Sequence, residues 1–188
     1  RCEIDPLTGD VFLGDVGEFA MDELSQYVRP ALGALPLRNF GWPWFEGTAV
    51  HLPCAGSVPA GLEAPIATVP NQPWVSLLAG PRYRNLGGRR QIDNDYEGSL
   101  FYADHGAGGV RRLVANGSWS PAPAVPGQPN AQDWGTGFQG ISSLRQGPDG
   151  ALWFTQHPGA LKRIRPLGPG NAIAAVSGSG QRVAAGDA

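Results

Sequence analysis

The chain has 188 residues, of which 41% are hydrophobic and 16% charged, and its formal net charge is -2. Lys and Arg together number 14 against 16 Asp and Glu, which excludes the basic surface typical of nucleic-acid-binding proteins. No apolar stretch reaches the roughly 18 residues of a membrane-spanning helix. The chain starts at Arg1 with neither an initiator Met nor a signal peptide, so we expect a processed form or a fragment.

The composition predicts an all-β fold. Gly (28) and Pro (18) make up about a quarter of the chain. Aromatic residues are spread through short apolar runs, and the periodicity of amphipathic helices is almost absent. Short apolar runs separated by glycine and proline indicate short strands joined by tight turns.

The first informative strand, Val11–Leu13, leads into the densest acidic cluster of the chain. It ends in Gly14–Gly17, where two glycines allow backbone conformations that turn main-chain carbonyls outward. Four carboxylates crowd this loop and its continuation: Asp15, Glu18, Asp22 and Glu23. Two interpretations stay open: a solvated polar loop with a capped turn, or a site for a hard cation built from carbonyl and carboxylate oxygens.

The two cysteines, Cys2 and Cys54, lie far apart in the sequence. They would form a disulfide in an oxidising compartment or remain as two buried thiols. Two cysteines alone do not decide between these states.

A repeated pattern of strand, polar loop and strand is the most informative feature of the chain. Gly98–His105 and Gly150–His157 both read as a glycine, an apolar and aromatic strand and a loop with a histidine. Each is followed by a strand that contains two cations, and Gly9–Val16 opens in the same way. The separation between the copies that begin at Gly9 and Gly98 leaves room for about one further unit, which we place near Pro73–Arg84.

Units that recur about every 40 to 50 residues are typical of β-propeller blades, which are small antiparallel sheets stacked face to face. The alternative is a pair of similar hairpins in a β-sandwich. A Pro- and Leu-rich stretch at 29–38 and a proline-rich surface loop at 118–134 do not fit blades. We divide the chain into a propeller part at 1–168 and, at 169–188, a flexible tail or the start of a following module.

Several further side chains have both a structural and a functional interpretation. His105 and His157 occupy equivalent loop positions, either as ligands or a base near the axis or only because the repeat places them there. Asp104 follows its apolar strand as Asp15 does, so both carboxylates would face the same side. Four aromatic residues would form a sugar-stacking platform or pack in the core: Trp42, Trp44, Phe45 and Trp74.

The first part of the chain carries four short motifs: Gly14–Gly17, Asp22–Leu24, Asn39–Pro43 and Glu46–Gly47. In this order they resemble the quinoprotein glucose/sorbosone dehydrogenase family, which also contains hedgehog-interacting-protein-like proteins. Looser likenesses further along extend the resemblance over about residues 5–165.

The resemblance implies a six-bladed β-propeller that binds pyrroloquinoline quinone (PQQ) and calcium on its central axis and oxidises aldose sugars at C1. It implies a periplasmic or extracellular location. It also implies that the main-chain carbonyls of Gly17 and Glu18 hold the calcium. From the acidic loop we add Asp15 to this site, and from the internal repeat we expect Asp104 and His105 to line the axis. The expected partners are a small-molecule sugar or an extracellular protein, and the remaining blades of the propeller.

The chain also departs from the family pattern. The family's catalytic His and an Arg–Asn pair lie in earlier blades, so we expect them upstream of this chain and assign no catalytic residue within it. Family enzymes carry a Lys where this chain has Gly106, and two Arg near Gly140 and Ser142. A quinone with several carboxylates needs such cations around it.

Length bears on the function as well. Six blades need roughly 240 residues, so this chain would supply only about the last three to four. An incomplete propeller exposes raw blade edges, so it would need its missing blades or a partner. Three functions stay open: part of an aldose dehydrogenase, a non-catalytic extracellular propeller for binding or adhesion, or a truncated gene product with no independent function.

Overall fold

The computed structural model describes residues 1–31, 36–51 and 57–165 of the chain. The predicted tail at 169–188 and Cys54 therefore lie outside the described residues, whereas Cys2 is exposed as a free thiol. The described residues form antiparallel β-strands and one short 3₁₀ turn, η1 (Asn94–Tyr96), and no α-helix. None of their helices is long and apolar enough to cross a membrane. The all-β prediction is confirmed.

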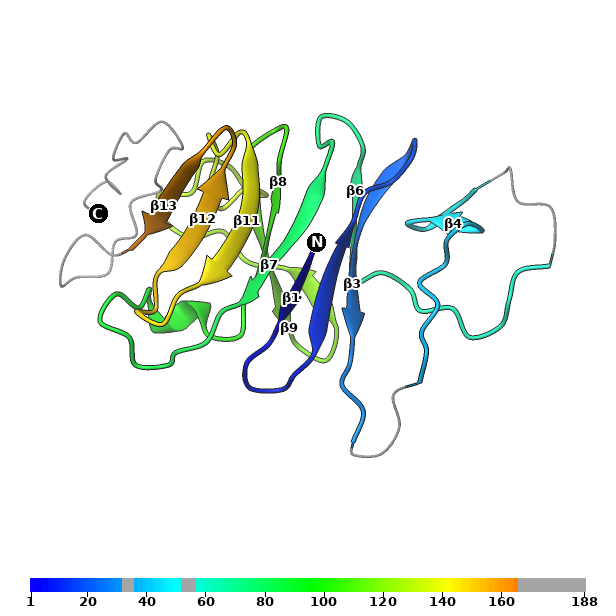
Figure 1. The fold of residues 1–188 in the computed structure, drawn as a ribbon, viewed down its shortest axis with the longest axis horizontal. Helices are drawn as coiled ribbons and strands as arrows, with labels where there is room; N and C mark the ends of the chain where they lie inside the picture. Colours follow the sequence, from blue (N-terminus) through cyan, green and yellow to red (C-terminus); the bar gives the residue numbers. More distant parts are fainter. Residues whose placement is uncertain (32–35, 52–56, 166–188) are drawn as a thin grey trace.

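Three sheets and one small hairpin make up the fold (Figure 1). The first sheet has the strand order β1-β2-β3-β6: β1 (Cys2–Ile4), β2 (Val11–Asp15), β3 (Met21–Tyr27) and β6 (Ala67–Pro70). The second has the order β10-β9-β8-β7: β7 (Leu77–Arg82), β8 (Leu100–Asp104), β9 (Val110–Ala115) and β10 (Trp119–Pro121). The third has three strands: β11 (Ile141–Gln146), β12 (Leu152–Gln156) and β13 (Ala160–Ile164).

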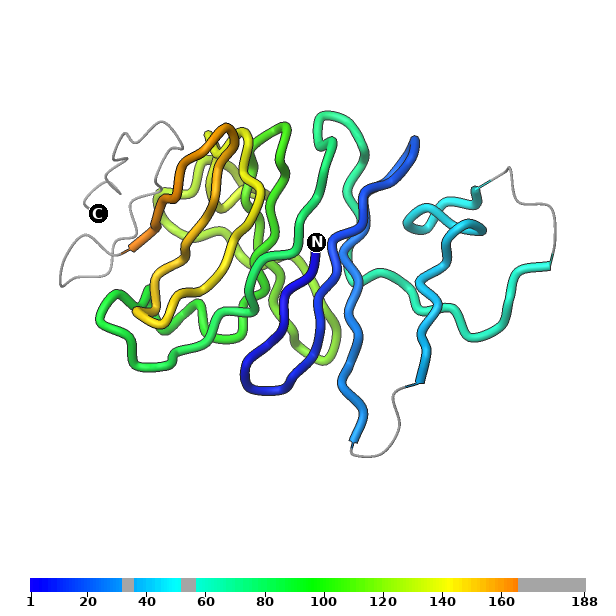
Figure 2. Tube along the Cα trace, in the orientation of Figure 1, coloured from blue at the N-terminus to red at the C-terminus, as the bar shows by residue number. Residues whose placement is uncertain are grey.

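The small hairpin consists of β4 (Phe45–Glu46) and β5 (Ala49–Val50), which pair antiparallel. Figure 2 shows that the chain leaves the stack after β3, carries this hairpin beside the first sheet and returns to the sheet as β6. The hairpin therefore belongs to a long excursion between two strands of one sheet.

The three sheets stack face to face, with β7 of the middle sheet next to β1, β2 and β11. The alternation of side chains along β8 explains why the middle sheet is buried on both faces. Leu100 and Tyr102 pack against the first sheet, in a core that also contains Phe12 and Leu24. Phe101 and Ala103 point the other way, into a core that includes residues of the third sheet.

The sequence repeat corresponds to the second strand of each sheet, since β2, β8 and β12 each pair with a strand on either side. The prediction of a further unit near Pro73–Arg84 is wrong, because that segment contains β7 of the same sheet as β8. The excursion with the β4–β5 hairpin fills the remaining space in the sequence. The predicted loop at 118–134 begins with a short strand, β10.

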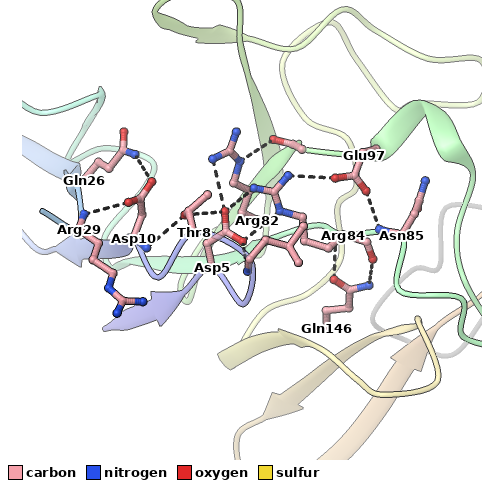
Figure 3. A network of polar contacts seen from close by, with 12 residues as sticks. Asp5, Thr8, Asp10, Gln26, Arg29, Arg82, Arg84, Asn85, Glu97 and Gln146 are labelled. Carbon is pink, nitrogen blue, oxygen red and sulfur yellow. Dashed lines mark hydrogen bonds and ion pairs between the residues drawn. The ribbon is translucent and has the colours of Figure 1, made fainter. Parts of the chain in front are cut away.

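A buried carboxylate joins the first two sheets at the turn between β1 and β2 (Figure 3). The Asp5 side chain is fully buried and accepts hydrogen bonds from Leu7 N and Thr8 Oγ1, each at 3.0 Å. Beyond its own turn, Asp5 forms a bidentate pair with the Arg84 guanidinium, whose Nε lies 3.0 Å from Oδ1. Arg82 reaches the same carboxylate at 3.4 Å.

Arg84 extends this network to the third sheet. Its backbone N–H donates to Gln146 Oε1 at 2.9 Å, and Gln146 Nε2 donates back to the Arg84 carbonyl. The guanidinium also donates to Glu97 Oε1 at 2.9 Å. One arginine, two residues after the end of β7, thus contacts groups from all three sheets or their connections.

Replacing Asp5 tests the network, and the effect should depend on pH. Burial alone would raise the pKa of Asp5, but the bonds from Arg84, Leu7 and Thr8 lower it from 3.8 to about 2. Because the folded pKa lies below the ordinary value, ionised Asp5 stabilises the fold above about pH 4, and this contribution disappears as the pH falls to about 2.

We expect Asp5→Asn to lower the free energy of unfolding by roughly 3 kcal/mol at neutral pH, since it leaves Arg84 without its main buried partner. The difference from wild type should shrink by roughly 2 kcal/mol between about pH 5 and pH 2. Urea denaturation at several pH values measures both. Glu63→Gln, which removes the exposed Arg38–Glu63 pair, is the control and should change stability by less than about 1 kcal/mol. A pH-independent Asp5→Asn effect would contradict this account.

Candidate functional site

The loops that follow β2, β8 and β12 lie along one edge of the stack, at the top of Figure 1. Backbone hydrogen bonds link the last two of these loops through Gly140. Gly140 N donates to the His105 carbonyl at 2.8 Å, and His157 N donates to the Gly140 carbonyl at 2.7 Å. His105 N in turn donates to the Ser76 carbonyl at 3.0 Å, next to the start of β7.

Two buried carboxylates fix the start of β7 at this edge. Asp104, at the end of β8, accepts hydrogen bonds from Val75 N and Ser76 N at 2.9 and 2.7 Å. Asp22, on β3, accepts one from the next amide, Leu77 N, at 2.8 Å. Both side chains are fully buried. Three successive N–H groups of the segment that enters β7 are therefore satisfied by carboxylates from the first and second sheets.

The other oxygens of these carboxylates hold two loops. Asp104 Oδ1 accepts from Ala107 N and so closes the loop after β8. Asp22 Oδ1 accepts from Gly17 N at 3.0 Å, in the loop between β2 and β3. Burial raises the pKa of Asp22, and the nearby negative charges of Asp104 and Glu46 raise it further. The hydrogen bonds from Gly17 N and Leu77 N lower this pKa, but the raising effects are larger.

A reciprocal pair of carboxylates joins the β2–β3 loop to the β4–β5 hairpin. Glu46 Oε1, on the hairpin, accepts hydrogen bonds from Phe19 N, Ala20 N and Met21 N at 2.7, 2.9 and 3.4 Å. In the opposite direction, Glu23 on β3 accepts from the hairpin's Gly47 N. We call this arrangement the Glu46–Glu23 clasp. The pKa of Glu46 is lowered overall, because the hydrogen bonds from the three N–H groups outweigh the effect of burial. The pKa of Glu23 is raised overall, mainly by burial.

The predicted cation ligands lie in the loop that the clasp holds. Asp15 and Glu18 are exposed at this loop, and the Glu18 carboxylate lies 3.5 Å from His51 Nε2. The Gly17 carbonyl accepts a hydrogen bond from Asn71 Nδ2 at 3.3 Å. A Cβ atom at Gly17 would lie 2.0 Å from the Met21 carbonyl oxygen, so the loop has this shape only with glycine there.

The chemistry of this loop fits a hard cation through main-chain oxygens. Among the described residues, no group of three or more His, Cys, Asp or Glu side chains is arranged to hold a metal. A cation at this loop would therefore depend on carbonyl oxygens such as those of Gly17 and Glu18, supplemented by the exposed Asp15 carboxylate, a donor set that calcium accepts.

The quinone fits less well. The resemblance of the sequence sets Gly106 against a Lys of the quinoprotein dehydrogenases, and places two of their Arg near Gly140 and Ser142. A Cβ at Gly106 would lie 2.1 Å from Val75 Cγ2, and one at Gly140 would lie 2.7 Å from the His157 carbonyl oxygen. The chain therefore packs closely at two of these positions, and none of the three supplies a cation for a quinone carboxylate.

Of the side chains predicted to line the axis, Asp104 has its hydrogen bonds directed to loop N–H groups. His105 is partly buried, and its Nδ1 lies 2.9 Å from the Ile141 carbonyl oxygen. The histidine pair predicted from the repeat is joined through the backbone of Gly140, as described above, and His157 is exposed.

The four aromatic residues do not form one platform. Trp74 is 3% exposed and lies under Arg111 in the core between the first two sheets, as the packing interpretation requires. Trp42 is 53% exposed, and its ring lies 4.8 Å from that of His51. Phe19, which is 72% exposed, stacks on the His51 ring with the two ring centroids 6.3 Å apart.

Sequence reasoning missed the roles of Glu46, Asn71 and His51. Glu46 belongs to the Glu-Gly step that follows the Trp-Pro motif, so the sequence singles out its position but not its partners. These partners lie more than 20 residues away along the chain, and no local pattern indicates them.

Solved structures share this fold. The chain superposes on a glucose dehydrogenase with a TM-score of 0.56 and 20% identity, over 88% of this chain and 43% of that one. A PQQ-bound aldose sugar dehydrogenase from Streptomyces coelicolor gives a TM-score of 0.53 and 18% identity, over 87% and 41%. The soluble aldose sugar dehydrogenase from Escherichia coli, in its apo-form, gives 0.54 and 17%, over 86% and 42%.

The chain thus spans less than half the length of these dehydrogenases. No protein-family model and no curated protein matches its sequence. At such low identity the likeness establishes the fold of the described sheets, and the functional comparison depends on the residues of the site.

The Asp104 carboxylate gives a direct test of the loop architecture. We expect Asp104→Asn to lower the free energy of unfolding by roughly 2 to 4 kcal/mol, because the new amide group places a donor against a backbone N–H and leaves it unsatisfied. Asp93→Asn, which alters an exposed cap of η1, is the matched control and should cost less than about 1 kcal/mol. Equal effects of the two substitutions in urea denaturation would show that Asp104 does not support the loops.

Proposed function

We propose that this chain is part of a PQQ-dependent sugar dehydrogenase, a β-propeller that oxidises an aldose at C1. The supporting observation is the fold shared with a PQQ-bound aldose sugar dehydrogenase over 87% of the chain, together with the motifs at the β2–β3 loop. Because the chain spans less than half of that protein, further blades would complete the ring. The proposed location is periplasmic or extracellular.

Within this proposal the described residues contribute a cation site and a scaffold. The carbonyl oxygens of Gly17 and Glu18, with Asp15 nearby, would hold calcium. Asp104 and His105 would line the axis, with Asp104 also fixing the adjacent loops. We derive no step through the quinone, because positions 106, 140 and 142 offer no cation for its carboxylates. The base that removes the C1 hydroxyl proton would come from the other blades.

Dye-linked oxidation tests the proposal. The full-length protein, supplied with PQQ and calcium, should oxidise at least one aldose, and the activity should fall after treatment with a calcium chelator and return when calcium is added back. Heat-inactivated protein with the same additions is the control for free quinone. Absence of turnover on every aldose tested would refute the dehydrogenase function.

A second candidate is a non-catalytic extracellular propeller that serves as a binding or adhesion module. The absence of a cation at Gly106, Gly140 and Ser142, all within the described residues, favours it. In that case isothermal titration calorimetry of the full-length protein should detect no binding of PQQ in the presence of calcium. Tight binding of the quinone would exclude this second function.

A further inference from the structure

The β2–β3 loop is oriented by an element that lies outside its own sheet. Glu46 is 4% exposed, and one of its oxygens faces three successive N–H groups, those of Phe19, Ala20 and Met21. Successive backbone N–H groups that converge on one anion form a concave nest. The loop therefore wraps around a carboxylate that the β4–β5 hairpin inserts into it.

This nest determines the direction of the Glu18 carbonyl. The Glu18–Phe19 peptide bond is not among the cis bonds of the chain, and in a planar trans peptide the N–H and C=O groups point in opposite directions. Because Phe19 N–H points to Glu46 Oε1 at 2.7 Å, the Glu18 carbonyl oxygen must point away from the hairpin. The same reasoning applies to the Phe19 carbonyl, since Ala20 N–H also points to Glu46.

The neighbouring peptides are held independently. Gly17 N donates to Asp22 Oδ1 at 3.0 Å, so the preceding carbonyl points away from β3. The Ala20 carbonyl accepts from Asn71 N at 2.9 Å, and Asn71 Nδ2 donates to the Gly17 carbonyl. Of the two carbonyls proposed as ligands, that of Gly17 is also held by Asn71, whereas among the described residues only the bond from Phe19 N–H to Glu46 sets the direction of the Glu18 carbonyl.

We propose that Glu46 is a positioning residue for the cation site: through the Phe19 N–H group it turns the Glu18 carbonyl outward to act as a calcium ligand. This inference rests on the proposed function, because it assigns a role to Glu46 within the cation site proposed there. Glu46 itself does not touch the cation. The clasp makes the hairpin part of the site, and Glu23 holds the hairpin in place by accepting from Gly47 N.

Terbium and calcium binding by the full-length protein test the role of Glu46. In Glu46→Gln one carbonyl oxygen remains to accept N–H groups, but without charge, and in Glu46→Ala the acceptor is lost. We expect the dissociation constant for calcium to rise about tenfold or more in Glu46→Ala and less in Glu46→Gln. The exposed Glu63, paired with Arg38 on the same excursion, provides the control Glu63→Gln, whose affinity should match wild type.

A spectroscopic measurement separates positioning from a general loss of stability. Luminescence lifetimes of bound Tb³⁺ in H₂O and D₂O count the water molecules on the ion, and in Glu46→Ala this number should rise by about one as the Glu18 carbonyl leaves the coordination shell. If Glu46→Ala does not fold, Glu46→Gln still reports a loss of calcium affinity, smaller than that expected for Glu46→Ala, with an unchanged melting temperature marking an intact fold.

The outcomes distinguish the two proposals. If the wild-type protein binds calcium and both Glu46 variants bind it within twofold, with unchanged water counts, the positioning role is refuted while the cation site stands. If the wild-type protein binds neither Ca²⁺ nor Tb³⁺, the proposed cation site is refuted and the positioning role with it. Protection of the Phe19 and Ala20 amides from hydrogen exchange would then show that Glu46 only closes the loop.

Discussion

The need to satisfy backbone N–H groups at buried strand ends governs this structure. The middle sheet is covered on both faces, and the carboxylates that meet the segment entering β7 are fully buried, although Val75 in that segment is itself 41% exposed. Carboxylates take the place of water there. Asp22 and Asp104 divide three successive amides at the start of β7 between them, and an unpaired amide in such a place would cost about 1 to 3 kcal/mol.

Acidic residues serve the two ends of the stack in different ways. At the end that carries the Asp5 network, Asp5 is paired with arginine, and the attraction between opposite charges lowers its pKa. At the opposite end the buried carboxylates accept backbone N–H groups, and burial leaves the pKa of Asp22 and Glu23 raised. One end is thus held by ion pairs between sheets, and the other by anions enclosed in backbone loops, which keeps negative charge next to the proposed cation site.

The sequence predicts the repeating part of this fold well and the site only in part. Short apolar runs such as Val11–Leu13 and the matching glycine-led strands indicate β2, β8 and β12, because alternation and turn residues are local signals. The assignment of Pro73–Arg84 to a separate unit is wrong, since strand pairing between β7 and β8 spans a loop that no local signal describes. The same limit hides Glu46, whose three donors lie more than 20 residues upstream.

The Glu46–Glu23 clasp also bears on how such a protein can diverge. The hairpin supplies the anion for the loop, and the strand after the loop supplies the anion for the hairpin, so neither segment has its hydrogen bonds satisfied alone. A recombination that exchanges the hairpin without the loop, or the loop without the hairpin, would leave buried donors or a buried charge unmatched. The two segments, separated along the chain by β3 and the stretch that leads from it to the hairpin, are therefore expected to be inherited and replaced as a single unit.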